Sequence, residues 1–303
     1  MQFTLKIIFQ KINNIISKFK KNSNFNAENN KHMNLKSTFI FCSTAALLTA
    51  CATNPFTGKS TLALVPDSQI LPSSFQQYSE FIAENKVVTG TADAKRIATI
   101  GNKIKEASEK WLAANGYSDY LKDYQWEYNL VQSDELNAWC MPGGKIVFYT
   151  GILPVAQSDA GIATIMGHEV AHALANHGQQ RMSAGQLQQY GSAITQAALG
   201  EKSATTQQIA MTAYGAVTEY GGMMPFSRKH ESEADKIGLT LMAIAGYNPD
   251  EAVPFWERMA AQGGGSTPEF LSTHPSNETR IKDIKALIPQ AKAEAAKFGV
   301  NFK

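Results

Sequence analysis

The sequence predicts an α+β fold, in which a small β-sheet is followed by a mainly helical region. Three observations indicate this fold: strand-like patterns gather between residues 125 and 150, helical spacing dominates beyond residue 158, and no βαβ unit repeats. With 303 residues, of which 44% are hydrophobic, the chain can bury one large core or two small ones. Its composition excludes a collagen-like, fully disordered or cysteine-rich protein.

The small net positive charge of the chain comes from its first residues. Residues 1–50 contain seven lysines and one acidic residue, so the overall charge of +2 leaves about −4 for residues 51–303. A slightly acidic body gives no electrostatic reason to expect a nucleic-acid partner.

Residues 33–51 resemble a bacterial lipoprotein signal. Lys36 provides a short positive region, and residues 39–48 form an apolar stretch too short to span a bilayer. Residues 48–51 (LTAC) resemble a lipobox, after which the chain is cut before Cys51 and the thiol receives a lipid. An ordinary secretory signal that ends beside a cysteine is the alternative. Ala52 is not the aspartate that typically retains lipoproteins in the inner membrane, so we expect an anchor in the outer membrane, on its periplasmic face.

The predicted organisation has three parts. Residues 1–50 form the leader and signal peptide, and we interpret Met33 as the initiator, with residues 1–32 outside the translated chain. Residues 51–71 form a lipidated tether with proline and glycine turns, and residues 72–303 form the folded domain. Cys42 lies in the signal and Cys51 carries the lipid. Cys140 is then left alone, and no intramolecular disulfide is expected.

The elements of the domain follow in order. Helical spacing predicts helices over residues 73–85 and 92–115, the second closed by Gly116. The aromatic-rich alternation of residues 125–131 favours a strand, and residues 137–150 form a predicted β-hairpin with a glycine turn. Residues 183–222 are rich in Gln, Ala and Gly and have two interpretations: a helical hairpin packed on the core, or a mobile lid or substrate-holding arm.

The chemistry-bearing motif is His168-Glu169-Val170-Ala171-His172, in a helix that Ser158 or Asp159 caps and Gly178 ends. Residues i and i+4 lie on the same face of a helix, so both imidazoles can reach one metal ion. Glu169 is rotated by about 100° from His168 around the helix, so it cannot easily be a third ligand, but it can reach a water that the ion activates. A helix with two isolated, structural histidines is the alternative.

A catalytic zinc site needs a third protein ligand. Glu231 and Asp235 are four residues apart at the start of a second predicted helix, which runs to about residue 245. Glu231 can bind the metal, while Asp235 accepts a hydrogen bond from a ligand histidine and sets its tautomer. A solvated acidic helix start is the alternative for both, and it is the expected role of Glu233.

These motifs resemble the gluzincin metallopeptidases of the HtpX and CAAX prenyl protease type. Further matches are residues 137–144 (NAWCMPGG), 225–228 (PFSR) and 272–275 (STHP) with Arg280 beyond them. With the lipobox, the absence of membrane-length helices and no evident tetratricopeptide repeat, they indicate the periplasmic lipoprotein branch, LoiP-like and BepA-like in its catalytic domain. Trp139-Cys140 departs from the family, where smaller or aliphatic residues are usual, which leaves the subsite preference open.

The resemblance implies a zincin-type fold with one zinc ion per chain, held by His168, His172 and Glu231. Glu169 would be the base, and His274 would either stabilise the oxyanion or occupy the fourth position on the metal and keep the enzyme latent. Asn137 and the strand after it would pair with an extended substrate. Arg280 would contact substrate or pair with an acid, His177 would complement the end of the active helix, and His230 points off the ligand face.

Two function classes follow. The first is a zinc endopeptidase, lipid-anchored at Cys51 to the outer membrane, that cuts misfolded or misassembled envelope proteins. The second is a chaperone or assembly factor for outer-membrane proteins with a latent zinc site. A third class, a purely structural zinc domain, is not favoured, because a base beside the metal has no structural use.

Overall fold

The computed structural model describes residues 51–262, 268–275 and 278–302. Residues 52–303 form one compact unit, which contains every element discussed below from β2 onward. The predicted signal and the start at Met33 lie outside the described residues, whereas much of the predicted tether lies inside them. Asn54, within that tether, is buried, and its side-chain amide donates to the carbonyl oxygen of Leu174 at 2.7 Å.

The sheet of the domain is small and mixed, with strand order β3-β4-β6-β5. Its strands are β3 (Val87–Val88), β4 (Glu127–Val131), β5 (Ala138–Met141) and β6 (Lys145–Tyr149). β4 and β6 run parallel, while β3 pairs with β4 and β5 with β6 in antiparallel fashion. Gly143 and Gly144 form the β5–β6 turn with φ of 87° and 82°, which only glycine adopts easily. The predicted hairpin and the predicted strand are confirmed, whereas β3 is too short to have shown a pattern.

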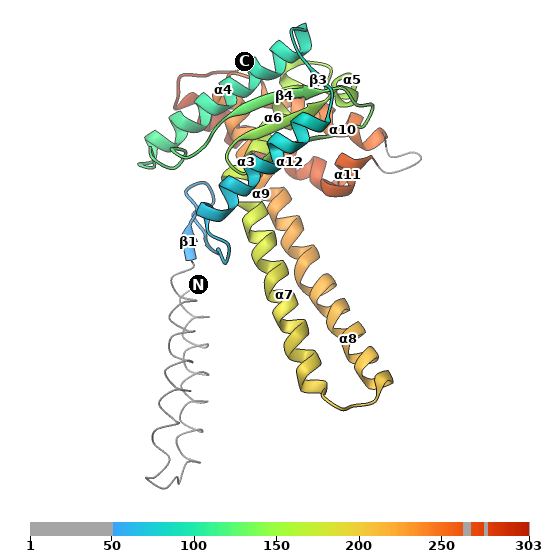
Figure 1. The fold of residues 1–303 in the computed structure, drawn as a ribbon. Helices are drawn as coiled ribbons and strands as arrows, with labels where there is room; N and C mark the ends of the chain where they lie inside the picture. The colour runs from blue at the N-terminus through green and yellow to red at the C-terminus, as the bar shows by residue number, and fades with distance from the viewer. Residues whose placement is uncertain (1–50, 263–267, 276–277, 303) are drawn as a thin grey trace. The chain divides into compact units, whose positions relative to one another are not determined.

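Helices make up most of the rest of the described chain (Figure 1). They are α3 (Asp67–Glu84), α4 (Ala92–Ala114), α5 (Leu153–Ala156), α6 (Asp159–Leu174), α7 (His177–Leu199), α8 (Ala204–Thr218), α9 (Met224–Ile244), α10 (Ala252–Ala261), α11 (Glu269–Thr273) and α12 (Glu278–Ala296). Single turns η2 (Thr150–Ile152), η3 (Glu219–Met223) and η4 (Pro249–Glu251) connect them, and β1 (Cys51–Thr53) pairs with β2 (Ser60–Leu62). The mainly helical α+β fold with a small sheet is as predicted.

Helix α3 begins at Asp67, inside the segment predicted as a tether, and not at Ser73. Proline normally breaks a helix interior, because it lacks an N–H and its ring clashes with the preceding turn. Here the helix continues through Pro72, and it buries Ile70 on the near side and Tyr78 on the far side of that proline.

Helix α6 carries the His-Glu-x-x-His motif and is the centre of the core. All its residues from Gly161 to Leu174 are buried, and it packs against α4, α9 and β5. A helix that is apolar around its whole circumference is buried on all sides. Ser158 caps it by accepting from the main-chain nitrogen of Gly161 at 3.0 Å, as predicted. Its end was predicted wrongly: Asn176, with φ of 57°, separates α6 from α7, and Gly178 lies inside α7.

Helices α7 and α8 form a long hairpin that extends away from the other elements of residues 52–303 (Figure 1). A helical hairpin is therefore present, but it does not pack on the core as the first interpretation expected, and a mobile lid or substrate-holding arm stays a prediction. Helix α8 has no buried residue, and Tyr190, Ile194, Ile209 and Val217 are all more than 60% exposed. No helix in the described residues is both long and apolar enough to cross a bilayer.

Candidate active site

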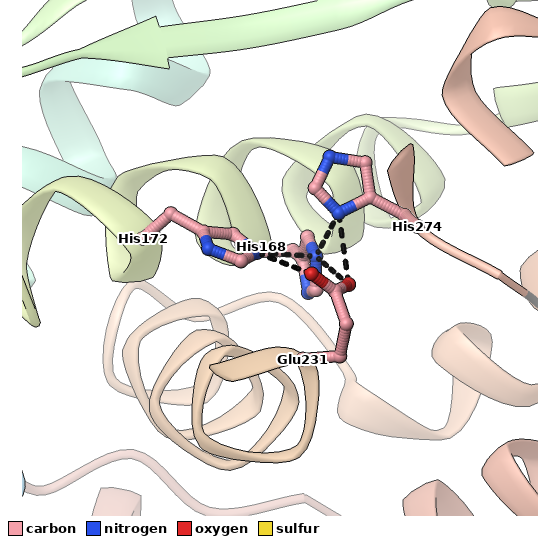
Figure 2. Close-up of side chains that lie close together, drawn as sticks. All are labelled: His168, His172, Glu231 and His274. Atoms are coloured by element: carbon pink, nitrogen blue, oxygen red, sulfur yellow. Dashed lines mark hydrogen bonds and ion pairs between the residues drawn. The ribbon is translucent and has the colours of Figure 1, made fainter. Parts of the chain in front are cut away.

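Four buried side chains from three parts of the chain converge at the centre of the domain (Figure 2). His168 and His172 come from α6, Glu231 from α9, and His274 from the residue after α11. Their potential ligand atoms all lie within 4.8 Å of one another. His168 Nε2 lies 3.1 Å from His172 Nε2 and 3.0 Å from His274 Nδ1. Glu231 Oε2 lies 3.3 Å from His168 Nε2, and its Oε1 lies 3.3 Å from His172 Nε2.

This donor set fits a zinc ion. Ligand atoms about 2.0–2.1 Å from a tetrahedral zinc are about 3.3 Å apart, close to the separations observed here. The Nδ1 atoms of His168 and His172 face other partners, so their Nε2 atoms face each other beside the Glu231 carboxylate. When each ring carries its proton on Nδ1, as a histidine that binds metal through Nε2 does, both Nε2 atoms present lone pairs. Three acceptors at such distances repel unless a cation lies between them. Glu231 Oε1 is also buried without a hydrogen bond among the described residues, which leaves it available to a metal.

His168 is oriented directly by a carboxylate. Its Nδ1 lies 2.9 Å from Asp235 Oδ1, one turn along α9 from Glu231. Although burial opposes it, hydrogen bonding to Asp235 and Glu231 raises the pKa of His168 to about 9. Burial also opposes the ionisation of Glu231, but its contacts with the histidines of the cluster hold its pKa far below the usual range.

Arg280 of α12 holds Asp235 in place. Its Nε and Nη2 lie 2.9 and 2.7 Å from the two carboxylate oxygens of Asp235, and its guanidinium stacks on Trp256 at 3.7 Å. The bidentate pair is buried and keeps the pKa of Asp235 low against the effect of desolvation. Of the two roles expected for Arg280, pairing with an acid is therefore observed, while contact with substrate stays a prediction.

Glu169 lies beside the cluster without belonging to the four potential ligands. It is buried, and burial raises the pKa of its carboxyl. Its Oε1 lies 3.3 Å from His274 Nε2 and makes no hydrogen bond among the described residues. A carboxylate in this position can accept a proton close to the metal site.

His172 is oriented through a second histidine. His172 Nδ1 lies 3.0 Å from Nδ1 of His177, whose Nε2 lies 3.2 Å from Glu233 Oε2. The Lys59 ammonium pairs with Glu233 Oε1. The hydrogen bond from His177, with a further one from Lys59, lowers the pKa of Glu233 to about 2.

These contacts correct two expectations. Glu233 is not a solvated acidic residue at a helix start, because it is inside α9 and binds His177 and Lys59. His177 does not complement the end of α6, because it begins α7 and is fully buried. His230 is not among the four potential ligands, in agreement with its expected position off the ligand face; it is buried, and its ring stacks on His177 at 4.0 Å.

The predicted substrate-binding strand is at an edge of the sheet. β5 pairs with β6 on one side, and within the described residues no strand pairs with its other side. Asn137 precedes β5, and its side-chain oxygen accepts from the main-chain nitrogen of Ala138 at 2.9 Å. A cavity of about 780 Å³ adjoins the cluster, lined by Glu231, Phe226 and Arg280 among others.

Lys59 and Trp256 were missed by the sequence reasoning. Trp256 lies among apolar residues at ordinary helical spacing. Nothing in the sequence around it indicates that it packs against a guanidinium group. The spacing of His177, five residues after His172, did not indicate a contact either, because a continuous helix would put the two side chains on different faces.

An α+β fold of this kind, with a His-Glu-x-x-His helix and a glutamate from a second helix, defines a zincin-type metallopeptidase. The chain belongs to Peptidase family M48, whose family model matches residues 102–288. Zinc is the metal of this family, in agreement with the predicted cofactor and with the donor set described above.

Several curated proteins are similar to this chain. "Mitochondrial metalloendopeptidase OMA1" of Arabidopsis thaliana is 35% identical over 205 residues, which are 65% of this chain and 40% of the relative. "Metalloendopeptidase OMA1, mitochondrial" of Homo sapiens is 29% identical over 246 residues, 78% of this chain and 46% of the relative. "Beta-barrel assembly-enhancing protease" of Escherichia coli is 29% identical over 161 residues, 52% of this chain and 33% of the relative. The chain thus spans about half or less of the length of these relatives.

Proposed function

We propose that this chain is a zinc-dependent endopeptidase of the periplasmic lipoprotein branch of its family. It is anchored by a lipid on Cys51 to the periplasmic face of the outer membrane, and it hydrolyses misfolded or misassembled envelope proteins. The observation that carries the enzymatic part is the buried cluster of His168, His172 and Glu231 with the Glu169 carboxylate beside it.

Each residue has a defined task in this proposal. His168, His172 and Glu231 hold the zinc ion, which supplies Lewis-acid activation of a water and of the substrate carbonyl when it is bound. Glu169 accepts a proton from the attacking water and passes it to the leaving amine. The unpaired edge of β5, following Asn137, binds the substrate backbone as an added strand.

His274 has two roles open to it. Its Nδ1 lies 2.8 Å from Glu231 Oε2, within the ligand cluster, and its Nε2 faces Glu169. In this arrangement it can occupy the fourth position on the metal. Displaced from the ion, it can donate a hydrogen bond to the developing oxyanion.

The proposed location and substrates are supported by the signal sequence and by the name of one relative. The lipobox over residues 48–51 supports lipid attachment, and one relative carries a name that refers to β-barrel assembly in Escherichia coli. The OMA1 relatives are named as mitochondrial. Fractionation of cells that express the full chain and a Cys51→Ser variant tests the anchor, because only the unmodified chain should stay with outer membranes.

The enzymatic proposal is tested with the purified, zinc-loaded chain and casein or an unfolded outer-membrane protein. We expect cutting that a chelator stops and zinc restores. Glu169→Gln should lower kcat by about 10²–10⁴-fold while zinc remains bound. Glu106→Gln, an exposed glutamate on α4, is the matched control and should cut normally. Full activity of Glu169→Gln would contradict the assigned chemistry.

The placement of His274 also favours a second candidate, an assembly factor whose zinc site stays latent. Complementation of a cell that lacks the gene distinguishes the assembly factor from the peptidase. Rescue of its phenotype by the Glu169→Gln variant would support the assembly factor, whereas failure of rescue at normal protein levels would support the peptidase.

A further inference from the structure

The two histidines of α6 are oriented in different ways. His168 Nδ1 reaches the Asp235 carboxylate directly, at 2.9 Å. Among the described residues, His172 Nδ1 meets no carboxylate, and it lies 3.0 Å from another imidazole nitrogen, Nδ1 of His177. His177 reaches a carboxylate in turn, with its Nε2 3.2 Å from Glu233 Oε2.

Proton counting determines how these groups share hydrogens. A histidine that presents the lone pair of Nε2 to a metal carries its proton on Nδ1. His172 Nδ1–H must therefore donate to His177, and Nδ1 of His177 must accept. The proton of a neutral His177 is then on Nε2, where it donates to the Glu233 carboxylate. A charged His177 would place two N–H groups against each other, so the neutral form is required.

We propose that His177 and Glu233 are positioning residues, which set the tautomer and ring orientation of His172 so that its Nε2 faces the metal. This inference depends on the proposed zinc site. His172, His177 and Glu233 form what we call the histidine relay. In this relay Glu233 orients His172 through the imidazole of His177, whereas Asp235 orients His168 by direct contact.

The surroundings of His177 support this role. The left-handed turn at Asn176 separates α6 from α7 and brings His177 back against the last turn of α6. The His177 side chain is fully buried, and the ring of His230 stacks on it at an interplanar angle of 10°. Burial and stacking hold the plane of the ring, and the contacts of Nδ1 with His172 and of Nε2 with Glu233 favour one of the two ring orientations in that plane.

Lys59 connects the relay to the segment that follows Cys51. Its ammonium pairs with the Glu233 oxygen that His177 does not use. Asn54, in the same segment, donates to the carbonyl oxygen of Leu174, the last residue of α6. The Lys59 side chain is 61% exposed, so its contribution to Glu233 is weaker than that of the buried His177.

The test compares His177→Leu with His177→Asn. Both side chains branch at Cγ and have a similar shape, but only asparagine offers an oxygen near the former Nδ1 that can accept from His172. Zinc dissociation constants are measured on the full chain by competition with a chromophoric chelator. The visible spectrum of the cobalt-substituted chain and the melting temperature of the zinc-free chain are recorded beside them.

We expect His177→Leu to weaken zinc binding by about 10–100-fold and to alter the cobalt bands. His177→Asn should restore most of the affinity. Glu233→Gln should weaken binding by less, because the amide oxygen still accepts from His177, and Lys59→Met by less again. Glu251→Gln, which breaks a half-buried pair with Arg258 away from the cluster, is the matched control and should bind zinc normally.

Equal zinc affinity and equal cobalt spectra for His177→Leu and the unmodified chain would overturn the inference. So would equal losses for the leucine and asparagine variants, because a merely structural role does not depend on the acceptor. If His177→Leu fails to fold, the zinc affinities and cobalt spectra of His177→Asn and Glu233→Gln are compared instead. His177→Asn should then keep most of the zinc affinity, and Glu233→Gln should weaken zinc binding. Failure of the unmodified chain to bind zinc would instead refute the proposed function.

Discussion

Gly167 of α6 and Gly238 of α9 lie in backbone contact where their helices cross. A Cβ atom on Gly238 would be 2.8 Å from the main-chain nitrogen of His168, and one on Gly167 would be 2.7 Å from the carbonyl oxygen of Gly238. Two helices approach this closely only where neither has a side chain. Glu231 lies two turns before Gly238 on α9, so the crossing brings its carboxylate to the histidines.

The first prediction concerns this crossing. Gly238→Ala should push α6 and α9 apart, lower the free energy of unfolding by about 1–3 kcal/mol and weaken zinc binding, because Glu231 moves away from His168. Denaturant unfolding and chelator competition measure the two effects. Gly185→Ala is the control: nothing lies within 4 Å of the added methyl in α7, and alanine should stabilise that helix by up to about 1 kcal/mol. Normal stability of Gly238→Ala would contradict the steric argument.

The second prediction concerns the buried pair of Arg280 and Asp235. Arg280→Met keeps most of the side-chain volume but leaves Asp235 as a buried carboxylate without its bidentate partner. We expect a loss of about 3–5 kcal/mol in the free energy of unfolding. Arg96→Met removes two surface ion pairs and should cost less than about 1 kcal/mol. Similar losses for the two variants would show that burial of the Arg280 pair has no special effect.

The third prediction concerns removal of the metal. Zinc that binds the folded cluster but not the unfolded chain stabilises the fold, by about 2.7 kcal/mol at a free concentration one hundred times the dissociation constant. The melting temperature should therefore rise with zinc concentration and fall after treatment with a chelator. Calorimetry measures this shift. A Glu231→Gln variant should show a smaller rise, whereas a melting temperature independent of zinc would argue against a metal in the cluster.

The fourth prediction concerns the α7–α8 hairpin. Ile194 and Ile209 are 69% and 66% exposed, so replacing both with serine should change the free energy of unfolding of the domain by no more than about 0.5 kcal/mol. Leu241→Ala, at a site that is 1% exposed, should cost about 2–5 kcal/mol. Thermal unfolding of the three proteins makes the comparison. A large loss from the serine variant would mean that the hairpin packs on something in solution.

Local features of the site could be predicted from sequence because they depend on short spacings. The four-residue separation of His168 and His172 places them on one helical face, and the same spacing places Asp235 one turn from Glu231. The cap at Ser158 and the glycine turn of the β5–β6 hairpin follow from side-chain chemistry within a few residues. The end of α6 was mistaken because asparagine, like glycine, can adopt the left-handed conformation.

Contacts between distant segments could not be predicted in the same way. The relay contact of His172 with His177 requires a chain reversal at Asn176, and the link of Lys59 to Glu233 joins residues that are 174 positions apart in the sequence. The hairpin of α7 and α8 has helical spacing whether or not its apolar residues are covered. Periodicity reports a helix but carries no information about what packs against it.

The sequence by itself determined the chemistry of this protein: a paired-histidine helix, a glutamate from a second helix and a base between the histidines. Only the tertiary structure decided how these side chains are positioned. It does so through the Gly167–Gly238 crossing, the Arg280–Asp235 pair and the histidine relay. The physical reason is that ligand spacing within one helix is set by its pitch. The approach of separate helices depends instead on the close packing of atoms that are remote in the chain.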